Sequence, residues 1–135
     1  MSEIMTNHES KSILIRPPVE RDAAAMWRLA ENSTVLDKNS FYCYFLLFRF
    51  FSSTCAVAES QGEVVGFASA FVPPQTANTL FLWQVAVADH MRQQGIAYAM
   101  TANILKRAPA AINTLEATIS LENMPSQSLF SALAR

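Results

Sequence analysis

The run of residues 79–87 places the strongest limit on the fold of this chain. Its sequence, TLFLWQVAV, is apolar on both sides of an alternating strand pattern. A strand that is buried on both faces occurs where helices cover both sides of a sheet. The run therefore predicts a central strand in an α/β protein.

The other elements follow from hydrophobic periodicity and from turn residues. Gln61-Gly62 separates two apolar runs, as in a β-hairpin with a two-residue turn. Pro17-Pro18 ends a strand and opens a helix that carries acidic residues in its first turn. In chain order we expect a mobile tail at 1–11, a strand at 12–16, helices at 19–32 and 41–51, strands at 54–60, 63–72 and 79–87, a helix at 92–107, a strand at 115–121 and a helix at 125–134. The predicted fold is α/β, with a mixed, mainly antiparallel central sheet flanked by helices.

Length and composition indicate one domain, at 12–135, and exclude several classes of protein. The 135 residues carry 10 basic and 11 acidic side chains, which argues against a broad nucleic-acid surface. The two cysteines and two histidines lack metal-site spacing, so we expect no metal. Residues 1–11 lack the apolar core of a secretory signal. We therefore expect a cytoplasmic protein in which Cys43 and Cys55 are buried thiols.

The run 41–51 is the most apolar segment of the chain. It is too short to span a bilayer, which takes about 20 residues. It exceeds the usual length of a strand and has no Gly or Pro, so it is interpreted as a helix. Large apolar patches seldom stay exposed. The helix therefore belongs either to the core or to a homodimer contact.

Gly95 lies between the strand at 79–87 and the next helix, and no turn motif explains it. A glycine at a helix N-terminus lets an anion approach backbone N–H groups that have no helical partner. Arg92 would add a full positive charge. The pattern is typical of a phosphate site, although a plain loop glycine before a helix is an alternative.

The sequence R-x-x-G-x-A after a strand ending in V-A-V resembles the acyl-CoA loop of the GNAT superfamily of N-acetyltransferases, and the order of elements is similar. The resemblance implies that acetyl-CoA is a co-substrate, that loop amides hold its pyrophosphate, and that the strand pairs with its pantetheine arm. The cofactor-binding residues implied are Val85, Ala86, Val87, Arg92, Gln93, Gln94, Gly95, Ile96, Ala97 and Asn123.

Three segments carry a narrower resemblance, to the diaminobutyrate acetyltransferases within this superfamily. They are Ile15–Pro18, Leu36–Tyr44 and Thr79–Val87. The resemblance implies acetyl transfer to the 4-amino group of L-2,4-diaminobutyrate, a step in biosynthesis of the compatible solute ectoine. It implies a small-molecule amine as partner, with neither nucleic acid nor membrane involved.

An amine with a pKa near 10 must lose a proton before it attacks a thioester. Asp37 is the first candidate for holding the amine, and a helix N-cap is its alternative role. Tyr42 is the second catalytic candidate, and Glu122 is a weaker alternative carboxylate. The substrate-binding candidates are Asp37, Asn39, Tyr42, Trp83 and Gln84.

Two departures from the superfamily pattern affect catalysis. Many members carry a tyrosine in the last helix that protonates the leaving thiolate, but the corresponding residue here is Phe130. The resembled enzymes also continue beyond the point where this sequence ends, at Arg135. The alternatives are therefore an acetyltransferase for another small amine, or a non-catalytic acyl-CoA-binding module.

Overall fold

A computed structural model describes residues 2–5, 12–33, 39–118, 129 and 133. Six strands form one sheet in which spatial order follows chain order. All pairings are antiparallel except the last, where β6 runs parallel to β5. The strands are β1 Ser2–Met5, β2 Ser12–Arg16, β3 Ala56–Ser60, β4 Glu63–Phe71, β5 Thr79–Val87 and β6 Thr114–Glu116.

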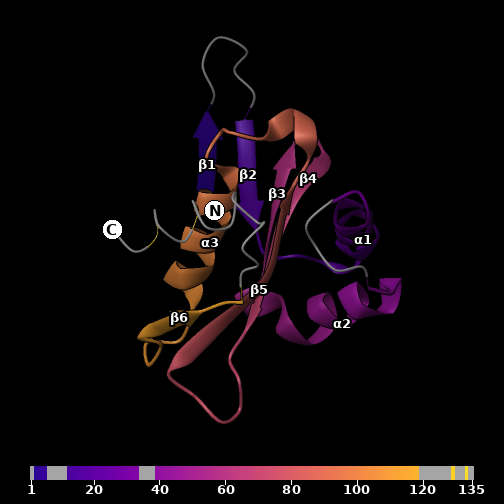
Figure 1. Ribbon diagram of the computed structural model, residues 1–135. Coiled ribbons are helices and arrows are strands. Elements are labelled where there is room, and N and C mark those ends of the chain that lie inside the picture. Colours follow the sequence, from indigo (N-terminus) through magenta and orange to yellow (C-terminus); the bar gives the residue numbers. More distant parts are fainter. Residues whose placement is uncertain (1, 6–11, 34–38, 119–128, 130–132, 134–135) are drawn as a thin grey trace.

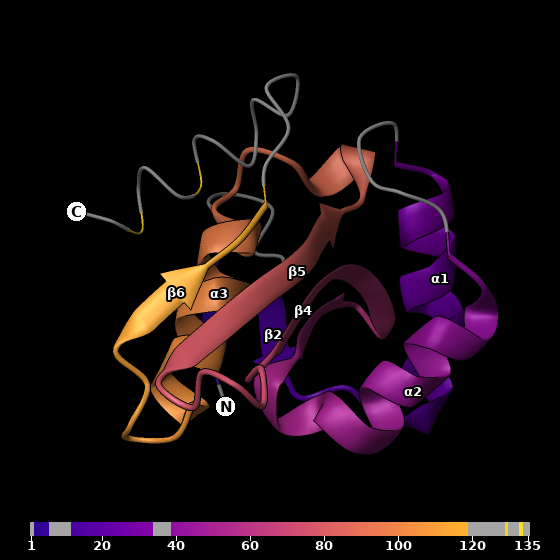
Figure 2. The ribbon, with the colours of Figure 1, turned by 60° about the horizontal axis from the view of Figure 1, so that its bottom comes forward.

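Helices cover both faces of this sheet (Figures 1 and 2). On one face, α1 (Ala23–Glu31) and α2 (Phe41–Phe51) pack over a core cluster that includes Met26, Tyr44 and Phe67. On the other face, α3 (Ile96–Arg107) packs over a cluster that includes Met100 and Ile104. Three short 3₁₀ helices complete the described elements: η1 Glu20–Asp22, η2 Ser52–Thr54 and η3 Asp89–Met91. The predicted α/β fold with a mixed, mainly antiparallel sheet is confirmed.

A β-bulge at Trp83 changes which face of the sheet the side chains of β5 occupy. Leu82 and Gln84 pair with adjacent residues of β4, so Trp83 is the extra residue. Before the bulge, Leu82 belongs to the cluster under α3. After it, Val85 packs against that cluster and Ala86 belongs to the cluster under α1 and α2. The bulge therefore turns Gln84 towards α2, where strict alternation would have turned it towards α3.

The guanidinium of Arg16 ties β2 to β3 and to the start of the first helical segment. Its Nη1 and Nη2 donate to the two carboxylate oxygens of Asp22 at 2.7 and 3.0 Å. Its Nε and Nη2 donate to Oε1 of Glu59 at 3.3 and 2.8 Å. Asp22 also accepts a 2.7 Å hydrogen bond from the backbone N–H of Val19. The buried Asp22 carboxylate is therefore satisfied by three donated hydrogen bonds.

Most predicted elements are confirmed, and some boundaries differ. The strands at 12–16 and 79–87 and the helix at 41–51 have the predicted bounds. The predicted helix at 19–32 divides into η1 and α1, because Asp22 caps a 3₁₀ turn through the N–H of Val19. The predicted helix at 92–107 begins only at Ile96, because Gly95 takes a left-handed conformation with φ of +75°.

The predictions for the two ends of the chain fare differently. The interpretation of 1–11 as a mobile tail is wrong for Ser2–Met5, which pair with β2 as an edge strand. The unpaired edge of β2 provides backbone partners that local sequence patterns do not reveal. The strand predicted at 115–121 is observed only as Thr114–Glu116. The predicted helix at 125–134 lies outside the described residues apart from Leu129 and Leu133.

Replacing Asp22 with alanine is expected to lower the free energy of unfolding by about 1–3 kcal/mol, because the half-buried guanidinium of Arg16 loses its bidentate partner and keeps only Glu59. Burial opposes ionisation of Asp22, but the hydrogen bonds from Arg16 and Val19 outweigh it and lower the pKa of this carboxyl. The stability contributed by the ionised Asp22 is therefore fully present above the unfolded-state pKa of about 4. It is lost as pH falls through the lower pKa that this carboxyl has in the folded protein. Urea unfolding between pH 2 and 7 measures both effects. Glu20→Ala, at an exposed acid in the same turn, is the control, and an equal loss in both variants would contradict the assignment.

Candidate active site

Among the described residues, only the first part of β5 is paired on the edge that faces β6. Only Thr79–Phe81 pair with β6, through Thr114–Glu116, whereas β5 continues to Val87 (Figure 2). Beyond Phe81, β6 therefore leaves the backbone groups on this edge of β5 unpaired. Buried or half-buried backbone N–H and C=O groups require partners, so this edge can pair with an extended ligand. Val85, Ala86 and Val87, the residues predicted to pair with pantetheine, lie on this segment.

The loop between β5 and α3 has the conformation of an anion site. Gln93 and Gly95 both have positive φ, at 62° and 75°. Successive backbone N–H groups in such turns converge on one point and favour anions. Gly95 is the N-cap of the twelve-residue α3, so the first N–H groups of that helix point out of its end. A Cβ on Gly95 would meet no atom within 4 Å, so its positive φ, not crowding, is what favours glycine here.

Arg92 lies half-exposed at the start of this loop. Its Nε lies 3.2 Å from Oδ1 of Asp89 and donates to the carbonyl oxygen of Val87 at 3.4 Å. Both contacts are at the surface, where ion pairs contribute little free energy. The guanidinium can therefore exchange them for a phosphate. The residues predicted to hold the pyrophosphate, Arg92 to Ala97, lie together in one turn and the start of one helix.

A buried polar pair joins α2 to β5. The hydroxyl of Tyr44 donates to Oε1 of Gln84 at 2.9 Å, and both side chains are almost wholly buried. Gln84 is further fixed because its backbone N–H donates to Oγ of Ser69 at 3.2 Å. Burial raises the pKa of Tyr44, and its hydrogen bonds with Asn39 and Gln84 only partly oppose this shift. Tyr44 is therefore a neutral phenol at physiological pH, able to donate and accept hydrogen bonds.

The structure separates the predicted substrate residues into groups. Asn39, Gln84 and the half-buried Trp83 lie around Tyr44 or on the adjacent part of β5. Tyr42 is 63% exposed and stacks on Phe45 at the outside of α2. Residues two apart on a helix point about 200° away from each other, so Tyr42 and Tyr44 face different sides of α2 and Tyr42 is not part of the buried pair with Gln84.

Tyr44 is a buried polar residue beside Gln84 that the sequence analysis did not select as a candidate. Helical spacing places Tyr44 on the same side as Leu47, and both are buried. This periodicity in 41–51 was the available signal, because only one of two tyrosines two positions apart can face the core. Asp37, Glu122, Asn123 and Phe130 lie outside the described residues.

The two thiols do not take part in this site as nucleophiles. Burial raises the pKa of the Cys43 thiol, and it raises the pKa of the Cys55 thiol to about 11. A thiol with a raised pKa carries little thiolate, which is the reactive form. Cys55 is buried, as predicted, whereas Cys43 is only half-buried, because it lies on the outer part of α2. Among the described residues, no group of three or more His, Cys, Asp or Glu side chains is placed to hold a metal ion, and no helix is long and apolar enough to cross a membrane.

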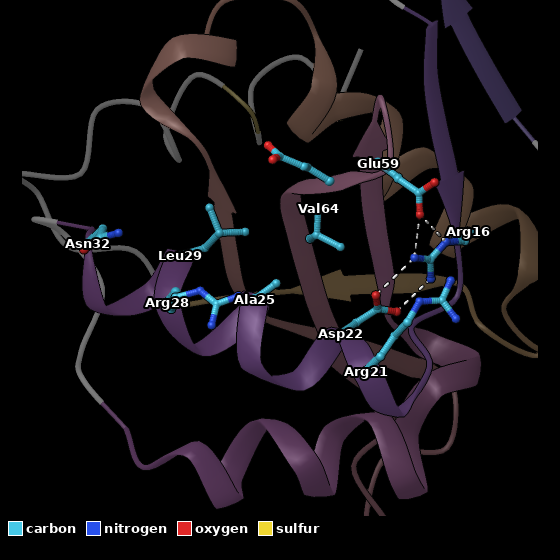
Figure 3. Close-up of a pocket in the computed structure, with 11 residues that line it drawn as sticks. Arg16, Arg21, Asp22, Ala25, Arg28, Leu29, Asn32, Glu59 and Val64 are labelled. Carbon is cyan, nitrogen blue, oxygen red and sulfur yellow. Dashed lines mark hydrogen bonds and ion pairs between the residues drawn. The ribbon is translucent and has the colours of Figure 1, made fainter.

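A groove of about 510 Å³ lies elsewhere, between α1 and the β3–β4 hairpin (Figure 3). Arg16 and its two carboxylate partners form one end, and Arg21, Arg28 and Glu63 line the rest. None of the predicted site residues contributes to its lining. Its charges are mixed and partly committed to the Arg16 network.

Comparison with known proteins is consistent with this geometry. The sequence profile of the Acetyltransferase (GNAT) family matches residues 18–134. The chain belongs to this family, as its resemblance in sequence had implied.

Within the family, the chain is similar to one group of enzymes. It is 43% identical over 131 residues to the L-2,4-diaminobutyric acid acetyltransferase of Marinococcus halophilus, covering 96% of this chain and 76% of that protein. It is 37% identical over 136 residues to the enzyme of that name from Halomonas elongata, covering 99% of this chain and 71% of that protein.

Solved structures support the same relationship. The chain superposes with a TM-score of 0.85 and 42% identity on the diaminobutyrate acetyltransferase EctA from Paenibacillus lautus, in complex with L-2,4-diaminobutyric acid and coenzyme A. The match covers 92% of this chain and 75% of that one. An aminoglycoside N-acetyltransferase in complex with CoA matches with a TM-score of 0.75 at 19% identity, over 91% of this chain and 87% of that one, and shares the fold.

Replacing Tyr44 with phenylalanine is expected to lower the free energy of unfolding by about 1–2 kcal/mol, because a buried acceptor on Gln84 loses its donor. Tyr42→Phe is the matched control on the same helix, and it should change stability by less than about 0.5 kcal/mol because its side chain is exposed. Urea unfolding of the two variants measures the difference. Equal effects would contradict the separate roles of the two tyrosines.

Proposed function

We propose that this protein transfers the acetyl group of acetyl-CoA to the 4-amino group of L-2,4-diaminobutyrate. The observation that carries this function is the similarity, at 42% identity over 92% of the chain, to a structure that contains both diaminobutyrate and coenzyme A. The open edge of β5 and the loop before α3 provide the matching geometry for the coenzyme. The product would be a precursor for ectoine, a compatible solute used in osmoadaptation.

For acetyl-CoA, the proposed site combines the edge and the loop described above. The pantetheine arm would pair with the backbone of Val85 to Val87, and the pyrophosphate would lie on the amides from Gln93 to Ala97. Arg92 would add a positive charge at the loop. Asn123 is assigned to this site by the family resemblance.

For the amine, the proposed pocket lies on the face of β5 towards α2. Asp37, Asn39, Trp83 and Gln84 are the proposed substrate residues, and Tyr44 replaces Tyr42 among them. The neutral 4-amine attacks the thioester carbonyl carbon, so that a C–N bond forms, the C–S bond breaks and the electron pair leaves with sulfur. The amine proton passes to a base or to water, and Asp37 is the proposed partner of the amine. Because a thiol has a pKa near 8.5, the thiolate can leave without a protein acid at modest cost.

Two finer points complete the proposal. We propose a cytoplasmic homodimer whose contact includes the exposed aromatic side chains of α2. These are Phe41, Tyr42, Phe50 and Phe51, which are 46%, 63%, 68% and 42% exposed. Exposed apolar patches of this kind favour association. A monomeric mass in light scattering would contradict the dimer.

The reaction is tested by incubating the protein with acetyl-CoA and L-2,4-diaminobutyrate and measuring thiol release. NMR of the product should place the acetyl group on the 4-nitrogen. The chain as given and one extended at its C-terminus to the length of its relatives are compared. Turnover of another amine only would indicate an acetyltransferase with a different substrate. CoA binding without turnover in either chain would indicate a non-catalytic acyl-CoA module.

Gly95→Val is expected to weaken CoA binding about tenfold, because a β-branched residue at φ of +75° costs roughly 1–2 kcal/mol and distorts the loop amides. Gly62→Val is the matched control, since Gly62 has φ of +81° in the β3–β4 turn. Both variants should lose stability, but only the first should lose affinity in calorimetric titration with CoA. Equal affinities for the two variants would exclude the loop as the site.

A further inference from the structure

The carboxylate of Glu31 has an unusual environment. Among the side chains that the structure describes, its Oε2 is the one buried nitrogen or oxygen atom without a hydrogen-bond partner. A buried unpaired acceptor costs about 1–3 kcal/mol, and more when it is charged. Arg28 lies one turn earlier, but the described residues show no ion pair between it and Glu31. Glu31 is half-buried as a residue, and one oxygen of its carboxylate is left without a donor among the described residues.

The position of Glu31 on its helix adds to this negative charge. Glu31 is the last residue of α1. The C-terminal end of a helix carries a partial negative charge, which disfavours acidic side chains and favours cations. The helix end and the carboxylate together make a site of negative potential. Such a site matches a cationic ligand that is absent from the free protein.

Glu31 also lies beside the proposed amine pocket. Ala30, its neighbour in sequence, packs in the same buried cluster as Tyr44. The charge of Glu31 contributes to raising the pKa of Tyr44, so the two groups interact electrostatically. Tyr44 in turn donates to Gln84 on β5. Glu31 therefore directly follows a residue of the buried cluster that contains Tyr44, the donor of the polar pair between α2 and β5.

We infer that Glu31 binds the 2-ammonium group of the diaminobutyrate substrate. The inference rests on the proposed function and deepens it. The substrate has two amines, and the 4-amine must be neutral when it attacks. Asp37 is already the proposed partner of the 4-amine, which must lose a proton before it attacks. The 2-amine stays protonated throughout the reaction. It can therefore form a lasting ion pair with a carboxylate. Glu31 is in this sense a substrate-binding and specificity-determining residue.

Glu31→Gln tests this role by keeping the shape of the side chain and removing its charge. For L-2,4-diaminobutyrate, we expect KM to rise about 100-fold with kcat within about threefold, because a buried charge pair is lost from binding. The compound 4-aminobutyrate lacks only the 2-ammonium group. Its inhibition constant against diaminobutyrate should change by less than about threefold. Glu63→Gln, at an exposed acid on the β3–β4 hairpin, is the control and should leave every constant unchanged.

Thermal unfolding of the free protein separates binding from a structural role. Removing an unpaired buried charge should leave Tm equal or higher in Glu31→Gln, whereas a structural role predicts a lower Tm. Equal losses for both ligands, or a fall in kcat with KM unchanged, would overturn the inference and leave the proposed function standing. No turnover of diaminobutyrate by the wild-type protein would overturn both.

Discussion

The β-bulge at Trp83 is the constraint on which both halves of the proposed site depend. A regular strand would place Leu82, Gln84 and Ala86 on one face of the sheet. The extra residue moves Gln84 and Ala86 to the face covered by α1 and α2, while Leu82 stays in the core under α3. One strand therefore supplies core side chains to both faces and still directs a polar side chain to Tyr44. Bulges commonly redirect side chains in this way next to active sites.

The same strand, β5, contacts the two proposed ligands through different groups: backbone groups along its edge and a side chain on its face. Its free edge beyond Phe81 offers backbone groups in the plane of the sheet, because β6 pairs only with its first residues. Its face offers the Gln84 side chain perpendicular to that plane. A thioester held along the edge and an amine held on the face would meet at the strand between them. In this proposed arrangement, one strand serves both ligands.

Patterns within single elements made much of the fold predictable. The apolar run of β5, the Gln61-Gly62 turn and the length of 41–51 each express a local rule, and each was confirmed. The edge strand β1 could not be predicted, because its pairing depends on β2 rather than on its own sequence. The burial of Tyr44 rather than Tyr42 has a similar cause. Both tyrosines lie in the segment Leu36–Tyr44 that carries the family resemblance. Which of them faces β5 depends on the orientation of α2, and packing against Met26 and Phe67 sets that orientation. The loop from Arg92 to Ala97 was predictable because glycine at a helix N-terminus is a local signal.

Two carboxylates show how stability and function divide within this chain. Asp22 receives two hydrogen bonds from Arg16 and one from the Val19 N–H, and its charge is fully compensated. Glu31, at the other end of the same helical segment, has a buried oxygen with no donor. The fold is therefore able to satisfy a buried carboxylate, and an arginine lies one turn from Glu31. Unpaired groups of this kind destabilise the free protein and persist where a ligand completes them. The contrast between the two ends of one helical segment is the physical reason for assigning Asp22 to the scaffold and Glu31 to the substrate.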